Sequence, residues 1–226
     1  YKMGDDKGMM PYITIANVAC GFHASDPSVM ARTVRLAKQH NVRVGAHPSL
    51  PDLQGFGRRE MKMRAEELTD CIVYQVGALT GFLEREGMQL FHVKPHGSLY
   101  GMAAKSREVA KAVADAAKIF KVPLMGMAGT LHEQVYTGEG LEFISEYYAD
   151  LDYADDGSVI ITREHHAIDP KRAAERALRA VREGIALSVN GSEVHVRADC
   201  ICVHSDTPNA VEVARSVKAA VADYLA

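Results

Sequence analysis

The chain repeats one pattern six times: a short apolar segment, a polar turn and then an amphipathic helical segment. The apolar segments are expected to be strands, at residues 13–20, 42–46, 90–94, 122–125, 141–147 and 199–203. Strands that alternate with helices form parallel sheets with right-handed crossovers. Their near-continuous apolar character predicts that both faces of the sheet are covered. We therefore expect an α/β fold, either a closed barrel or an open doubly wound sheet.

Polar side chains follow each predicted strand at its C-terminal end, and the stretch from His92 to Tyr100 shows this most clearly. Its strand breaks at Pro95, and alternation places His92, Lys94 and His96 on one face. The alternative is an edge strand with a surface lysine. Because the C-terminal ends of parallel strands meet at one edge of a sheet or one mouth of a barrel, the six strand ends predict a functional site.

The segment after the second strand contains Gly55-Phe56-Gly57 followed by Arg58 and Arg59. Two glycines around an aromatic residue, followed by paired arginines, predict a mobile segment that folds over an anionic group. The alternative is an ordinary surface turn with solvated arginines.

Helix-capping and turn residues predict the remaining elements. Helices are expected to begin at Asp26-Pro27, Asp169-Pro170 and Thr207-Pro208. Asn190-Gly191 predicts a two-residue hairpin turn. A further short strand is expected at 158–161, and the first residues, around Met3, are expected to form a loop or a helical turn. His165, His166 and His195 are interpreted as solvated.

Composition limits the function classes. The 226 residues are 47% hydrophobic and 24% charged, which suits one α/β domain spanning residues 1–226. A net charge of −3 with scattered basic residues argues against nucleic-acid binding. The apolar runs are shorter than the roughly 18 residues of a membrane span. Cys20, Cys71, Cys200 and Cys202 are interpreted as buried, reduced thiols of a cytoplasmic protein, with a zinc role as the alternative. The chain has no glycine-rich dinucleotide motif and no Walker lysine, which disfavours a mononucleotide-binding fold.

Five ordered motifs carry a family resemblance, and together they span nearly the whole chain. They are Asn17–Pro27 (NVACGFHASDP), Gly45–Pro48 (GAHP), Gly55–Arg59 (GFGRR), Lys94–Tyr100 (KPHGSLY) and Cys202–Pro208 (CVHSDTP). In these motifs the chain resembles the LamB/YcsF family, whose members are also called the A subunit of 5-oxoprolinase. It departs from the family pattern at Ser205, where glycine is usual, and at Leu151, where arginine is often found.

The resemblance implies a fold and an activity. The fold is an irregular seven-stranded β/α barrel of the glycoside hydrolase/deacetylase type, and we expect its first strand to be missing from this chain. The activity is the ATP-dependent opening of 5-oxo-L-proline, a lactam, to L-glutamate, with ATP and Mg²⁺ as cofactors. Two further subunits would be partners, no nucleic acid or membrane is expected, and a homo-oligomer is left open.

The chemistry of these side chains suggests roles at one common cavity. Lys94, Arg58 and Arg59 would hold phosphate charge, and Asn17, His23 and His96 would donate to the lactam oxygen or phosphate. Glu146 or Asp150 would be the base, Asp206 would orient His204, and His47 would be an acid or a donor. The predicted catalytic set is therefore Asn17, His23, His47, Lys94, His96, Glu146, Asp150 and His204. The predicted substrate or nucleotide contacts are Asp26, Arg58, Arg59, Tyr100 and Asp206, and no metal ligand is assigned.

Two other classes of function stay open. His92 and His96 have a spacing used by metal-dependent deacetylases, but a straight strand would hold the two imidazoles roughly 13 Å apart, so the turn at Pro95 would have to bring them together. The other alternative is a non-catalytic barrel that only scaffolds further subunits.

Overall fold

The computed structural model describes residues 4–160 and 166–225, which form two compact units. Unit 1 comprises Thr14–Ile144, and unit 2 joins the N-terminal residues up to Ile13 to the chain from Ser145 onward. The predictions made for Met3, Ile161 and His165 lie outside the described residues. That all 226 residues form one domain stays a prediction.

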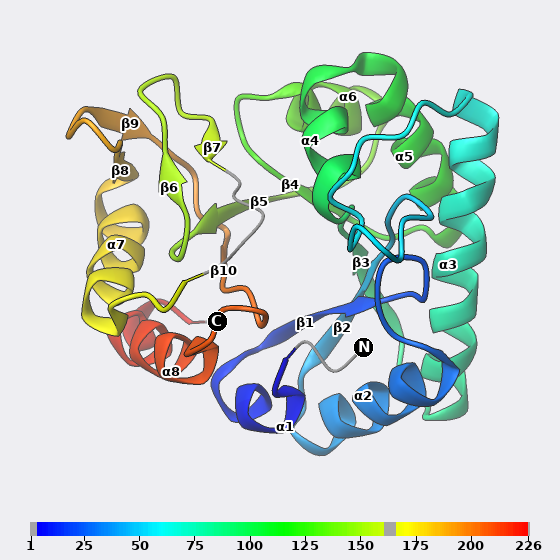
Figure 1. The fold of residues 1–226 in the computed structure, drawn as a ribbon, viewed down its shortest axis with the longest axis horizontal. Coiled ribbons are helices and arrows are strands. Elements are labelled where there is room, and N and C mark those ends of the chain that lie inside the picture. The colour runs from blue at the N-terminus through cyan, green and yellow to red at the C-terminus, as the bar shows by residue number, and fades with distance from the viewer. Residues whose placement is uncertain (1–3, 161–165, 226) are drawn as a thin grey trace. The chain divides into compact units, whose positions relative to one another are not determined.

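Unit 1 is built on parallel strands (Figure 1). They follow the order β1-β2-β3-β4-β5, and the pairs β1–β2, β2–β3 and β3–β4 are parallel. Their bounds are Ile15–Ala19, Arg43–His47, Leu90–Val93 and Leu124–Gly126 for β1 to β4, and β5 (Phe143–Tyr148) begins in this unit. This confirms the five strands predicted between residues 13 and 147.

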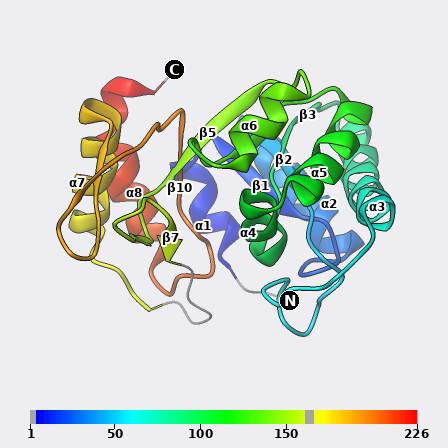
Figure 2. The same cartoon turned by 90° about the horizontal axis from the view of Figure 1, so that it is seen from above.

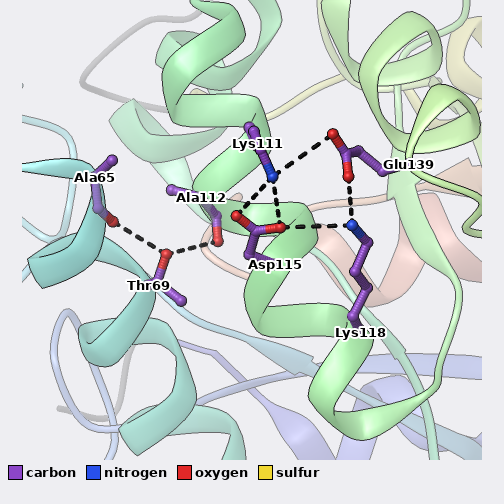
Figure 3. Close-up of polar contacts among 7 residues, drawn as sticks. All are labelled: Ala65, Thr69, Lys111, Ala112, Asp115, Lys118 and Glu139. Carbon is purple, nitrogen blue, oxygen red and sulfur yellow. Dashed lines mark hydrogen bonds and ion pairs between the residues drawn. The ribbon is translucent and has the colours of Figure 1, made fainter.

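Five helices accompany these strands: α2 (Pro27–Gln39), α3 (Ala65–Arg85), α4 (Gly97–Lys105), α5 (Arg107–Phe120) and α6 (Leu131–Gly138). Helix α2 packs on β1 and β2, α3 packs on β2 and β3, and α6 packs on β4. Helices α3 and α5 lie side by side, as Figure 2 also shows. The interface is completed by the hydroxyl of Thr69, which shares its hydrogen between the carbonyl oxygens of Ala65 at 3.0 Å and Ala112 at 3.2 Å (Figure 3).

A square of alternating charges ties α5 to the end of α6 (Figure 3). Lys111 Nζ lies 2.9 Å from Asp115 and 3.6 Å from Glu139, while Lys118 contacts both carboxylates. Isolated surface ion pairs contribute little, but a network of four groups shares the cost of ordering its side chains. The square is structural, because each cation already has two carboxylate partners.

Unit 2 contains the end of β5 and its parallel partner β10 (Cys200–Cys202). Two short antiparallel pairs accompany them, β6 (Asp152–Tyr153) with β7 (Val159–Ile160) and β8 (Ile185–Leu187) with β9 (Glu193–His195). The helical elements are α1 (Asp6–Met9), η1 (Met10–Tyr12), α7 (Pro170–Glu183), α8 (Ala210–Ala220) and η2 (Ala222–Tyr224). Helices α7 and α8 lie side by side in both views (Figures 1 and 2), and α7 buries only alanines.

Most predicted boundaries are confirmed. Asp26 and Asp169 cap α2 and α7. The β8–β9 hairpin is present, but the predicted two-residue turn is wrong: Leu187 pairs with Glu193, and Gly191 N donates to the carbonyl oxygen of Ser188, so the loop is longer. His166 and His195 are exposed, as expected. The predicted cap of the last helix is wrong: Asn209, not Thr207, precedes α8, and its side chain holds the backbone of Ile168. Helix α4 is not predicted, because the Gly-Ser-Leu-Tyr sequence at its start carries no helix signal.

The described strands that pair in parallel are the six predicted from the sequence. A seventh strand, and with it the complete seven-stranded barrel, stays a prediction. Within residues 4–160 and 166–225, no helix is long and apolar enough to cross a membrane.

A contact across β2 fixes the register of the first three strands. His92 on β3 is fully buried, and its Nε2 lies 2.6 Å from Oδ1 of Asn17 on β1. The imidazole crosses the intervening strand at Gly45, where an added Cβ would stand 1.9 Å from His92 Cε1. Only glycine therefore lets the His92 ring reach Asn17. Because burial and the charges of Lys94 and Arg43 lower the pKa of His92 to about 3, the ring is neutral at physiological pH.

We predict that Gly45→Ala lowers the free energy of unfolding by about 2–3 kcal/mol, because the new methyl group must displace the His92 ring and break its hydrogen bond. The matched control is Gly77→Ala on α3, where an added Cβ meets no atom within 4 Å. There we expect a gain of about 0.5–1 kcal/mol from reduced backbone entropy. Urea unfolding of both variants measures the difference, and equal effects would contradict this account of the strand crossing.

We also predict that stability falls as the pH drops below about 6.5. The unfolded chain then protonates His92, whereas the folded protein, in which the pKa of His92 is about 3, does not. One such group contributes a slope of about 1.4 kcal/mol per pH unit. In His92→Gln, whose amide can still donate to Asn17, the slope between pH 4 and 5.5 should be smaller by this amount. Chemical unfolding across that range tests it, and equal slopes in both proteins would refute it.

Candidate functional site

Three histidines and a lysine gather at strand ends in unit 1. His47 is the last residue of β2, Lys94 follows β3, and His96 precedes the first turn of α4. His23 lies in the loop after β1, and its ring stacks on His96 with centroids 3.9 Å apart and planes 9° apart. His23, Lys94 and His96 are between 2% and 8% exposed, whereas His47 is partly buried.

A chain of hydrogen bonds links two of these rings to the backbone. His47 Nδ1 lies 2.7 Å from the carbonyl oxygen of Lys94, and His47 Nε2 lies 3.1 Å from His96 Nδ1. His96 Nε2 in turn lies 2.8 Å from the carbonyl oxygen of Phe56. Every nitrogen of the two imidazoles therefore has a fixed neighbour.

The segment after β2 is folded onto this group. The buried carboxylate of Asp52 accepts from the backbone of Gly55 at 3.0 Å and from Arg59 Nε at 2.9 Å, which closes the turn. Phe56 and Gly57 are both left-handed, with φ of 55° and 67°, and this directs their carbonyl oxygens towards α4. The Gly57 oxygen accepts from Ser98 N at 2.9 Å. A left-handed aromatic residue is uncommon, and such strain concentrates at functional sites.

The electrostatics of the group favour neutral imidazoles and an anionic ligand. Burial and the charges of His96 and Arg58 lower the pKa of His23 to about 2. Burial, with His96, Lys94 and His23, also lowers the pKa of His47. Lys94 Nζ lies 5.8 Å from the centre of the Tyr100 ring, and the Arg58 guanidinium lies 5.0 Å from that of Phe56. His23 Nδ1 is buried with no hydrogen-bond partner among the described residues.

Unit 2 holds a second arrangement, an aspartate–histidine pair. Asp150 accepts from the backbone N–H of His204 at 2.6 Å and faces His204 Nδ1 at 3.1 Å through both oxygens. Tyr148 stacks on the imidazole with centroids 5.6 Å apart, and its hydroxyl donates to Glu146 at 3.0 Å. Burial alone would raise the pKa of Asp150, but the charge and hydrogen bonds of His204 outweigh it and lower that pKa. Asp150 is thus a carboxylate that can accept from His204 Nδ1 and orient the ring.

The structure brings some predicted residues together and gives others different partners. His23, His47, Lys94 and His96 form the predicted group in unit 1, and Arg58 acts on it. Glu146, Asp150 and His204 form the group in unit 2. That both groups line one cavity stays a prediction.

Three predicted residues have a structural partner instead. Asn17 binds His92, Asp26 caps α2 by accepting from Val29 N at 2.9 Å, and Arg59 pairs with Asp52. Asp150 contacts His204 Nδ1, while the orienting role predicted for Asp206 stays a prediction. The loop at 55–59, predicted to be mobile, is held by these hydrogen bonds in its folded form.

Sequence reasoning missed three residues that shape the site. The backbone carbonyls of Phe56 and Gly57 carry no side-chain signal, so no motif could identify them as acceptors. Tyr148, which supports both Glu146 and His204, follows Tyr147 in a run of aromatic residues that indicates only a buried strand. The residue in the sequence that best indicates this backbone contact is Gly97. Its φ of 55° favours glycine, and an added Cβ would stand 2.5 Å from the Gly57 oxygen.

The described part of the chain contains no group of three or more His, Cys, Asp or Glu side chains arranged to hold a metal ion. The metal-dependent alternative depends on His92 and His96. In the structure His92 contacts Asn17, and His96 contacts His47.

Comparison with known proteins places this geometry in a family. The model of the LamB/YcsF family matches residues 1–224. A protein of Bacillus licheniformis, named as the A subunit of 5-oxoprolinase, is 45% identical over 96% of this chain and 88% of its own length. An Emericella nidulans protein named lactam utilization protein lamB is 46% identical over 99% of this chain and 90% of its own.

A solved structure agrees with these sequences. The crystal structure of the lactam utilization protein from Thermus thermophilus superposes with a TM-score of 0.89 at 44% identity, covering 98% of this chain and 90% of that one. The resemblance noted in the five sequence motifs is thereby confirmed, and the chain belongs to the LamB/YcsF family.

Proposed function

We propose that this chain is the A subunit of a 5-oxoprolinase, which opens the lactam 5-oxo-L-proline to L-glutamate at the expense of ATP. The observation that carries the proposal is its similarity, over nearly its full length, to proteins named as 5-oxoprolinase A subunits and as lactam utilization proteins. The two groups of strand-end side chains supply the chemistry that such a reaction needs.

The reaction must overcome amide resonance in the lactam. In the proposed sequence, the γ-phosphoryl group of ATP passes to the lactam oxygen, and water then adds to the activated carbon. The C–N bond breaks as the ring nitrogen takes up a proton, which leaves γ-glutamyl phosphate and, from the first step, ADP. A second water then cleaves this acyl phosphate to glutamate and phosphate. Such a sequence requires positive charge for the phosphates, a base for the water and donors for the developing oxyanion.

The unit 1 group can supply positive charge for the phosphates and donors for the developing oxyanion. Lys94 and Arg58 bring positive charge, and the buried Nδ1 of His23 is a donor without a partner among the described residues. A triphosphate is recognised by such cations and donors. Since the described residues offer no cluster of metal ligands, we propose that Mg²⁺ arrives bound to the nucleotide.

The unit 2 group matches the need for a base. Asp150 orients His204 and stabilises the imidazolium that forms when Nε2 takes a proton from water. Glu146 is held by Tyr148 and is the second candidate for this role. Asp206, Tyr100 and Asp26 are retained as proposed substrate or nucleotide contacts.

The setting of the protein is also proposed. The names of its relatives describe them as subunits, which supports partner chains, and we propose two of them. All four cysteines are free thiols, which suits the cytoplasm, but the prediction that all are buried is wrong, because Cys71 and Cys200 are only partly buried. An assay that couples ADP release to glutamate formation, run with 5-oxo-L-proline, ATP and the candidate partner chains, tests the whole proposal. Glutamate formed without ATP would refute the mechanism, and no glutamate with all components present would support a scaffold role instead.

We predict that Lys94→Met lowers ATP-dependent turnover at least about a hundredfold, because a buried cation that stabilises transferred phosphate is lost. Folding should survive, since methionine fills a similar volume without a charge. Lys105→Met, at the exposed end of α4, is the matched control and should keep near-normal turnover. Near-normal turnover of Lys94→Met would remove Lys94 from the mechanism.

We predict that Asp150→Asn lowers kcat at least about a hundredfold and changes KM less than about threefold. The amide oxygen can still accept from the backbone N–H of His204, but the NH₂ group donates to Nδ1, which moves the ring proton to Nε2 and abolishes the base. The control Asp156→Asn lies in an exposed turn of the same unit and should have no effect. If both variants are equally active, His204 does not depend on Asp150 and another base must be sought.

A further inference from the structure

The contact between His47 and His96 contains more acceptors than two neutral rings can satisfy. The rings meet edge to face, with centroids 4.9 Å apart and planes 81° apart. Their facing nitrogens, His47 Nε2 and His96 Nδ1, are 3.1 Å apart, which is hydrogen-bonding distance. One hydrogen must therefore lie between them.

The outer nitrogens of the pair also need hydrogens. A carbonyl oxygen can only accept, so His96 Nε2 must donate to Phe56 and His47 Nδ1 must donate to Lys94. A neutral imidazole carries one N–H. Once both outer nitrogens are protonated, two neutral rings would face each other with lone pairs. The three observed contacts are satisfied together only if the pair holds three protons and one positive charge.

In the protein without a bound anion, the surroundings of the His47–His96 pair oppose its positive charge. Desolvation and the charges of His96, Lys94 and His23 lower the pKa of His47, whereas its hydrogen bond to Lys94 raises it. Arg58 adds positive charge beside His23. The thiol of Cys20 lies near the backbone of His47. It stays neutral because burial raises its pKa to about 12. The third proton is therefore costly until negative charge enters the group.

We propose that His47 and His96 form a proton-sharing pair that takes up one proton when an anion binds at the unit 1 group. The anion is a phosphate-type or carboxylate group, because both are recognised by the same cations and donors. In the proposed function these would be the phosphates of ATP or the carboxylate of 5-oxo-L-proline. The proposal rests on that function only for the identity of the anion.

Isothermal titration calorimetry tests the proposal without turnover. Sulfate and 5-oxo-L-proline serve as probes at pH 8, because neither changes its own protonation there. Titration in buffers of different ionisation enthalpy gives the number of protons taken up for each anion bound. We expect about one proton for at least one probe, and the probe that gives it shows whether the pair serves a phosphate or a carboxylate. Binding of both without uptake, or binding of neither, would overturn the proposal.

A matched variant assigns the proton to the pair. In His47→Gln the side-chain amide can donate to His96 Nδ1, so the contact no longer needs an extra proton. We expect anion binding to persist while uptake falls from about one proton to near zero. His40→Gln, at the exposed end of α2, should retain the full uptake. If His47→Gln still takes up one proton, a different group is the acceptor and the pair is not the proton store.

As a separate readout, ¹⁵N NMR of the histidine rings with and without sulfate reports which nitrogens carry hydrogen. It keeps the proposal testable if His47→Gln folds poorly, since it uses the unmodified protein. We expect the third N–H of the pair to appear on sulfate addition, and its absence at saturating sulfate would refute the proposal. Neither measurement needs ATP hydrolysis, so failure here and failure of the proposed function are distinguishable.

Discussion

The hydrogen bond between His96 and the Phe56 carbonyl holds the unit 1 site together. It joins the segment after β2 to the start of α4, and the neighbouring bond from Ser98 N to the Gly57 carbonyl reinforces it. Both bonds require left-handed backbone at Phe56 and Gly57. Gly97 must lack a Cβ for the Gly57 carbonyl to approach. Through this single backbone contact the orientation of His96 is set, and His96 in turn sets His47.

The same reasoning explains why so few charged side chains are needed to organise the site. Backbone carbonyls fix the tautomers of His47 and His96 without adding negative charge. The group keeps its positive character because no carboxylate is used to orient its rings through these bonds. The buried carboxylate of the loop, Asp52, is instead occupied by Arg59 and the turn backbone.

Particular residues show how much of the fold and of the site the sequence predicts. The alternation of apolar segments and helices predicts all six parallel strands. The strand ends indicate His47, Lys94 and His96, which the structure brings into contact, while their role in a functional site stays a prediction. Pairing across strands is harder, because the sequence does not give the register. Asp206 lies close to His204 along the chain and was the natural choice to orient it. In the structure Cys202 is level with Tyr148, so two residues further on His204 meets Asp150.

The two imidazole arrangements differ in the charge they favour, and this difference suits two opposite proton tasks. In unit 2, His204 faces the carboxylate of Asp150, and a carboxylate beside an imidazole stabilises the protonated ring. In unit 1, burial and neighbouring cations lower the pKa of His23 and of His47 and so favour the neutral rings. A lactam hydrolase needs a base while water attacks and a proton source while the ring nitrogen leaves. Environments that push similar side chains towards opposite protonation states are the physical means by which one protein provides both.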